Sequence, residues 1–121
     1  MILFMALTAL SLKADDNLDR GIAAIKAGDY VKALNILKNV PKDSYEGNLY
    51  YGVALFKTGS LAEAEKFLKS SVKQEEENPL AYSTLGEIYT QQKKYSDAAL
   101  QFEKSKKFLP LLNTFGRLPC Q

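Results

Sequence analysis

The sequence predicts an all-α fold in which antiparallel helical hairpins repeat and stack as a right-handed α-solenoid. Three glycines each stand twelve residues before an alanine, and the pairs are Gly21 and Ala33, Gly52 and Ala64, and Gly86 and Ala98. The glycines are 31 and 34 residues apart, a period typical of helical-hairpin arrays. Apolar residues recur at helical spacing, and no segment alternates as a strand would. We therefore expect three hairpins, at about residues 15–41, 45–77 and 79–110.

The first hairpin is bounded by turn and capping residues. Its first helix is expected over about 17–27, and Gly28 ends it because glycine readily takes the left-handed backbone past a helix end. Asp29 then caps a second helix over about 30–39. The 31-residue spacing makes this unit three residues shorter than the next one. We expect its second helix to be shorter by almost one turn.

The second hairpin carries two capping-box sequences. Asp43-Ser-Tyr-Glu46 is expected to open its first helix, which ends before Gly59. Ser60-Leu-Ala-Glu63 is expected to open its second helix, which runs to about Lys73.

The third hairpin begins at Asn78-Pro79, since asparagine accepts hydrogen bonds from free amides and proline is tolerated in the first turn. Its first helix is expected to reach about Gln92. Its second helix is expected over about 95–109, and Pro110 ends it.

Two terminal segments differ from the hairpins. Residues 2–12 are apolar and uncharged, but too short for a membrane-spanning helix of about 20 residues. Residues 1–14 fit a secretory signal peptide with Ala14 before the cut, which predicts export to the periplasm or the exterior. The alternative is an apolar helix that is retained, in a cytoplasmic protein or one that contacts a membrane. Residues 111–121 are expected to be a short tail or an incomplete capping helix.

Composition excludes several functions. The net charge is +2 with no basic stripe, which argues against nucleic-acid binding. The chain has no histidine and one cysteine, Cys120, so neither a zinc site nor a His-based catalytic group can be assembled. No phosphate-binding loop is present. We expect no enzyme activity, no cofactor, no metal and no small-molecule substrate.

Residues 15–110 resemble the tetratricopeptide repeat. The third unit matches its pattern best, with Tyr in place of Trp, at Tyr82, Leu85, Gly86, Tyr89, Tyr95, Ala98, Phe102 and Pro110. Arg20 and Tyr51 stand where the family prefers leucine, and Ser71 and Ser105 replace a common alanine. Small residues at each crossing let the two helices approach closely. The wedge beside each crossing is expected to be filled by Tyr30, Leu61 and Tyr95.

The resemblance implies that the first helices of the hairpins line a concave groove that binds another protein as a peptide or an amphipathic helix. The groove residues predicted in this way are Leu18, Ile22, Lys26, Leu49, Tyr50, Val53, Phe56, Lys57 and Glu87. Tyr50 and Phe56 are the expected anchors, and Lys26 and Lys57 could pair with acidic flanks. Alternatively, Val53 and other residues of this set, and Ile25 on the same helix as Ile22, pack between units, or residues 1–12 or 111–118 fill the groove.

The expected function is therefore a non-enzymatic protein–protein interaction module that scaffolds an assembly. The alternative is a self-associating homo-oligomer, or a fragment of a longer array. Chaperone-binding members of the family hold a C-terminal carboxylate with lysine and asparagine side chains. Leu18, Ile22 and Tyr50 stand at those positions here, so the resemblance implies no binding of the acidic tails of heat-shock chaperones.

Overall fold

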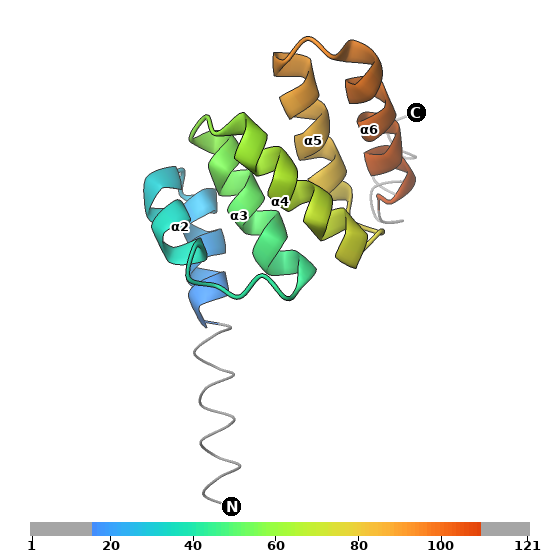
Figure 1. Cartoon of the computed structure of the whole chain (residues 1–121). Coiled ribbons are helices and arrows are strands. Elements are labelled where there is room, and N and C mark those ends of the chain that lie inside the picture. Colours follow the sequence, from blue (N-terminus) through green and yellow to red (C-terminus); the bar gives the residue numbers. More distant parts are fainter. Residues whose placement is uncertain (1–15, 110–121) are drawn as a thin grey trace, which may run out of the picture.

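The computed structural model describes residues 16–109, and all regular structure in this part of the chain is helical. A helix over residues 16–26 is followed by α2 (Tyr30–Leu37), α3 (Tyr45–Lys57), α4 (Leu61–Gln74), α5 (Pro79–Gln91) and α6 (Tyr95–Lys107). Consecutive helices pair as hairpins that stack side by side (Figure 1). The predicted all-α repeat solenoid is confirmed. The predicted leader (1–14) and C-terminal segment (111–121) lie outside the described residues.

The predicted glycine turns have the expected backbone. Gly28 has φ +83° and Gly59 has φ +94°, which is the left-handed conformation that glycine adopts at low cost. In the third hairpin the same position is held by Lys93, with φ 63°. None of the helices within residues 16–109 combines the length and hydropathy that membrane crossing requires.

The helix α2 ends earlier than the sequence predicted, at Leu37 instead of about residue 39. It has 8 residues, against 14 in α4 and 13 in α6, so the expected shortening is confirmed and is larger than one turn. The Lys42 Nζ donates to the carbonyl oxygens of Leu37, at 2.9 Å, and Val40. The Leu37 carbonyl also accepts from the Val40 amide at 3.1 Å, so the ammonium group adds a second hydrogen bond that ties the following loop to the end of α2.

The predicted side-chain caps are only partly correct. Asp29 caps α2 as expected, because its Oδ1 accepts from the Lys32 amide at 3.3 Å. The capping box at residues 43–46 is wrong, since Ser44 is the residue before α3 and makes no side-chain cap bond. Ser60 precedes α4 as predicted, also without a side-chain cap bond. Asn78 precedes α5, but its Nδ2 donates to Ser71 Oγ at 2.8 Å instead of the side chain capping the helix.

The small residues at the hairpin crossings have the predicted role. Ala64 is fully buried, and a Cβ placed on Gly52 would lie 2.8 Å from Leu68 Cγ. In the third hairpin, a Cβ on Gly86 would lie 2.7 Å from Phe102 Cε1. A larger side chain at these glycines would thus force the helices apart. The predicted wedge is wrong for Tyr95, which is 64% exposed.

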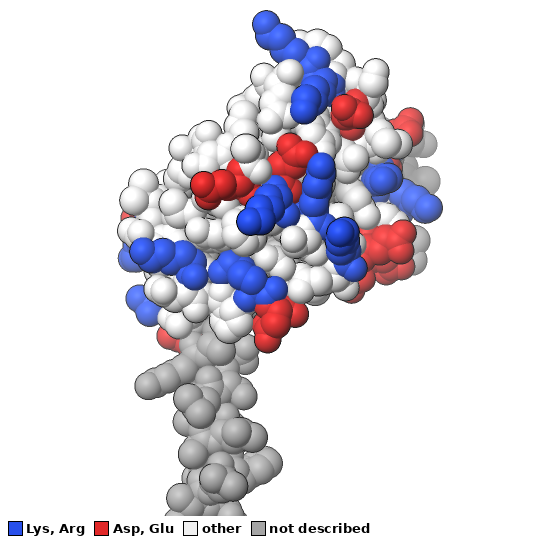
Figure 2. Space-filling view, in the orientation of Figure 1, with Lys and Arg blue, Asp and Glu red and all other residues white. Residues whose placement is uncertain are grey.

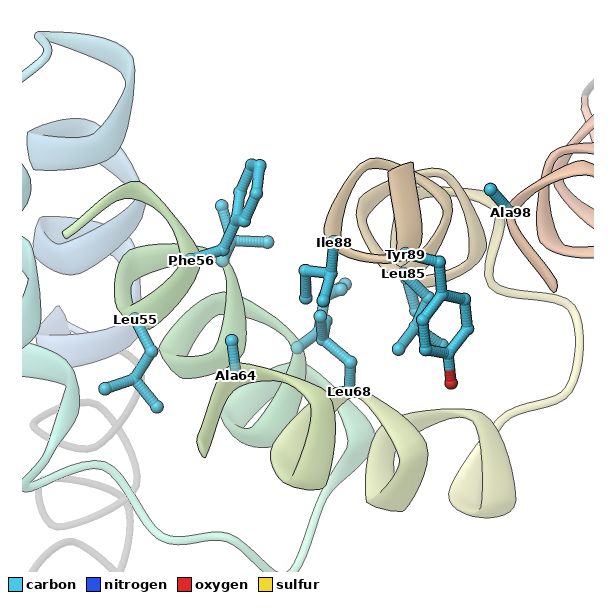
Figure 3. Packing of buried hydrophobic residues seen from close by; sticks show 11 residues of the cluster. Leu55, Phe56, Ala64, Leu68, Leu85, Ile88, Tyr89 and Ala98 are labelled. Carbon is cyan, nitrogen blue, oxygen red and sulfur yellow. The ribbon is translucent and has the colours of Figure 1, made fainter. Parts of the chain in front are cut away.

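The core consists of two adjoining clusters. The larger one joins α3, α4 and α5 through residues such as Leu49, Leu68 and Ile88 (Figure 3). The smaller one joins the helix over 16–26 to α2 and α3. Half-buried Tyr50 and Tyr51 pack against both clusters. The array is therefore held together by contacts between hairpins as well as within them.

Candidate functional site: the concave face of the first helices

The nine predicted groove residues lie on the first helices of the three hairpins but differ in accessibility. Leu49, Val53 and Phe56 are buried, Leu18, Ile22 and Tyr50 are half-buried, and Lys26, Lys57 and Glu87 are exposed. We use the name "concave face" for the surface of the predicted groove. It consists of the exposed and half-buried members of this set together with Leu80.

The buried members are covered because α3 packs directly against α5. Phe56 is 9% exposed and lies in the same cluster as Leu85 and Ile88 of α5. In Figure 3 it lies at the α3 edge of this cluster, on the side that faces away from α4. A partner on the concave face can therefore meet only a small part of the Phe56 ring.

Tyr50 of the second hairpin is the half-buried aromatic residue of the concave face. Its ring packs against residues of both core clusters, which fixes its position. Burial, and then the neighbouring Tyr45 and Glu46, raise the pKa of its phenol above the ordinary value. The hydroxyl thus stays protonated at neutral pH and can donate a hydrogen bond to a partner.

Lys57 is held over two aromatic rings. Its Nζ lies 5.7 Å from the centroid of the Tyr30 ring and 5.6 Å from that of Phe56. Such contacts at exposed sites contribute about 0.5–1 kcal/mol. The ammonium group is accessible, but it also helps join α2 to α3.

The third hairpin adds Leu80, which was not among the predicted groove residues. Leu80, near the start of α5, is 41% exposed. It stands six residues before Gly86, and Glu46, which is exposed, stands six residues before Gly52. The repeat register therefore indicates that a residue at this position is exposed, and this signal could have identified Leu80. Leu80 and Glu87 are seven residues apart, which places them on one side of α5.

The hydroxyl groups of α5 are already used within the helix. Ser83 Oγ and Thr84 Oγ1 donate to the Leu80 carbonyl at 3.1 and 2.7 Å, and Thr90 Oγ1 donates to the Gly86 carbonyl at 2.8 Å. Leu80 and Glu87 add an exposed apolar side chain and an exposed charge to this helix.

Charges of both signs are spread over the molecule. Figure 2 shows Lys and Arg interspersed with Asp and Glu over one face. In residues 16–109, no group of three metal-ligating side chains is arranged to hold an ion. The arrangement suits contact with a protein surface or segment better than binding of a polyanion.

One ionic cluster lies between α4 and α5 and is structural. Lys69 Nζ lies 2.7 Å from Glu65 Oε2, and the Tyr89 hydroxyl donates to the same oxygen at 3.2 Å. The hydrogen bond from Lys69 is the main cause that lowers the pKa of the Glu65 carboxyl. This cluster stabilises the contact between the second and third hairpins.

Comparison with protein families gives one match. A family model described as tetratricopeptide repeat matches residues 24–83. This range covers most of the first hairpin, all of the second and the beginning of α5. A search of curated proteins gives no match.

Solved structures share the fold. The second TPR of Spaghetti (RPAP3) bound to the HSP90 peptide SRMEEVD is 21% identical, with a TM-score of 0.71, covering 79% of this chain and 92% of that one. A crystal structure of MamA is 22% identical, with a TM-score of 0.72, covering 88% of this chain and 64% of that one. A MamA D159K mutant is 27% identical, with a TM-score of 0.73, covering 84% and 60%. The chain thus spans less than two thirds of these MamA chains.

Proposed function

We propose that this chain, a tetratricopeptide-repeat protein, is a non-enzymatic module that binds another protein along its concave face and so scaffolds a protein assembly. The family match and the structural neighbours support a protein-interaction scaffold. Helical arrays of this kind bind partners over an extended surface and seldom catalyse reactions.

The observation that carries the proposal is the exposed side chain of Leu80 on the concave face. An apolar side chain that is 41% exposed, about two turns along α5 from the carboxylate of Glu87, offers an apolar contact on the same side of the helix as a charge. Half-buried Tyr50 on the neighbouring helix adds a phenol that can donate a hydrogen bond. We propose as ligand a peptide or amphipathic helix with apolar anchors.

The proposed groove consists of the nine residues predicted from the sequence, together with Leu80. Lys26, Lys57 and Glu87 would contribute charge, and Leu18, Ile22 and Tyr50 would contribute half-buried apolar surface. Leu49, Val53 and Phe56 would mainly support this surface from below, because their side chains are buried.

The test compares the proteins captured by two variants with those captured by the wild type from the native compartment. A Leu80→Glu, Glu87→Lys double variant changes only exposed groups of the concave face. A Leu100→Glu variant is the matched control, because Leu100 is 49% exposed on α6, outside that face. We expect quantitative mass spectrometry to show partners that are lost with the double variant and kept with the control. Identical captured sets for all three proteins would refute the concave-face proposal.

We further propose that the chain is exported after cleavage following Ala14, so that it works in the periplasm or outside the cell. The uncharged run over residues 2–12 supports this. Mass spectrometry of the mature N-terminus tests it, since an intact residue 1 would instead favour a retained segment that could contact a membrane. Self-association, the other function expected from the sequence, would use the ends of the array and not the concave face.

A further inference from the structure

The contact between the first and second hairpins shows how one internal junction of this array is built. Leu37 of α2 is fully buried, and the next hairpin supplies Ala54, which is also fully buried. At the edge of the same junction, Lys57 of α3 lies over the Tyr30 ring of α2. In this junction, a large apolar residue and an aromatic ring on one side meet a small residue and a lysine on the other.

The C-terminal face of α6 presents the first half of such a junction without a partner among the described residues. In the repeat register, Phe102 stands where Leu37 and Leu68 stand in the other hairpins, and Tyr95 stands where Tyr30 stands. Leu37 and Leu68 have no exposed surface, whereas Phe102 is 41% and Tyr95 64% exposed. Two aromatic side chains are thus accessible at positions that are more deeply buried elsewhere in the array.

The N-terminal face of the helix over 16–26 presents the second half. Ala23 stands where Ala54 and Ile88 stand in the other hairpins, and Lys26 stands where Lys57 stands. Ala54 and Ile88 are fully buried, while Ala23 and Lys26 are exposed.

This second face is also hollow. A cavity of about 280 Å³ lies between the helix over 16–26 and α2. Its floor is apolar and its edge charged, and the lining residues are Ala23, Ala24, Ala27 and Ile36 with Arg20, Asp29 and Lys32. The residues at the same repeat positions in the other hairpins are larger. Leu55 and Tyr89 correspond to Ala24, Tyr51 corresponds to Arg20, and Phe67 corresponds to Ile36. In the second hairpin Tyr51 and Phe67 fill this region with an edge-to-face contact, their ring centroids 4.8 Å apart. The alanines of the first hairpin leave room for apolar side chains from outside.

We propose that the two faces bind each other between copies of this chain, so that α6 of one copy packs head to tail on the N-terminal hairpin of the next. Tyr95 and Phe102 supply the bulk that the alanine-lined cavity lacks. Lys26 of the next copy comes over the Tyr95 ring, as Lys57 does over Tyr30 at 5.7 Å. The contact repeats the geometry of the internal junctions, so its two surfaces differ and it can extend into a linear assembly. Apart from Lys26, it uses other residues than the concave face, and it does not depend on the function proposed for that face.

The experiment uses two variants of the full chain that each block one face. Ala23→Glu places a carboxylate in the N-terminal cavity, and Tyr95→Glu places one on the α6 face. Both positions are exposed, so each variant should fold, which circular dichroism checks. We expect the wild type to show a weight-average mass that rises with concentration in sedimentation equilibrium. Each variant alone should associate at least about tenfold more weakly, since taking the added charged side chain out of water in the contact costs more than about 1.4 kcal/mol.

Mixing the two variants is the decisive part of the experiment. The intact α6 face of Ala23→Glu can still bind the intact N-terminal face of Tyr95→Glu, and the blocked outer faces prevent further growth. We therefore expect a 1:1 mixture to form dimers and nothing larger. Leu100→Glu is the matched control and should associate like the wild type, because its register counterpart Lys66 is exposed at an internal position. A wild type that stays monomeric, variants that associate unchanged, or a mixture that stays monomeric would each overturn the proposal.

Discussion

Two buried serines, Ser71 and Ser105, illustrate what a single residue adds to the repeat. Each hydroxyl donates at 2.9 Å to the first carbonyl of its own hairpin, that of Tyr45 or Pro79, 26 residues earlier. Ser71 Oγ also accepts from Asn78 Nδ2 at 2.8 Å and so reaches the next hairpin. The sequence marked both serines as departures from alanine. It could not assign their role, because the acceptor is a backbone carbonyl and carries no sequence signal.

Replacing these serines should lower stability by different amounts. Ser71→Ala removes a hydrogen bond to the Tyr45 carbonyl and leaves the amide of Asn78, which is 3% exposed, without its acceptor. We expect a loss of about 1–3 kcal/mol in the free energy of unfolding. Ser105→Ala breaks one bond at a site that is 9% exposed, and we expect about 1 kcal/mol or less. Urea unfolding of both variants measures the difference. An equal or reversed order would contradict this account of Ser71.

At the scale of the helices, the starts were easier to predict than the ends. Glycine turns placed the beginnings of α2 and α4 correctly, because a left-handed residue is a local requirement. The end of α2 was missed, since the Lys42 ammonium group that hydrogen-bonds the carbonyl of its last residue, Leu37, comes from the following loop. The third hairpin places Lys93, with φ 63°, at the turn position of Gly28 and Gly59. A lysine gives no sequence indication of a left-handed backbone.

This turn predicts a stabilising substitution. A non-glycine residue in the left-handed region costs about 1–2 kcal/mol, while glycine adds entropy to the unfolded chain worth about 0.4–1 kcal/mol. Lys93→Gly should therefore stabilise the fold by about 0.5–1 kcal/mol and raise the Tm. Lys94→Gly is the control, since Lys94 has φ −92° and gains no conformational relief. We expect its Tm to fall slightly in thermal unfolding followed by circular dichroism. A lower Tm for Lys93→Gly than for the wild type would refute strain at this turn.

For the whole molecule, contacts within hairpins could be predicted and contacts between hairpins only in part. The glycine–alanine register fixes the crossing of two consecutive helices, and Ala64 and Ala98 are buried there as expected. The accessibility of the concave face depends on how closely α3 approaches α5. Leu49 and Phe56 therefore share a pattern with Tyr50 in the sequence but are buried in the structure. The apolar character of a first helix does not by itself separate a binding surface from a packing surface.

The residues at three positions of the concave face argue against one class of ligand. The RPAP3 neighbour is bound to the HSP90 peptide SRMEEVD, whose side chains include three carboxylates. The family resemblance implies that Leu18, Ile22 and Tyr50 stand at the positions where chaperone-binding members hold a C-terminal carboxylate, and none of these three residues is a cation. Exposed Glu87 adds a carboxylate to the same face, and the Lys57 ammonium lies over two rings.

We therefore expect the peptide SRMEEVD to bind this chain more weakly than about 1 mM, equivalent to a binding free energy smaller than about 4 kcal/mol. Isothermal titration calorimetry at low salt is the most demanding measurement, because low ionic strength strengthens any attraction between the peptide and exposed lysines. A peptide with its C-terminus amidated is the control and should behave identically, since no clamp is available to recognise the carboxylate. Saturable micromolar binding that requires the free carboxylate would show that the fold can hold this group without the clamp residues, and would contradict the prediction.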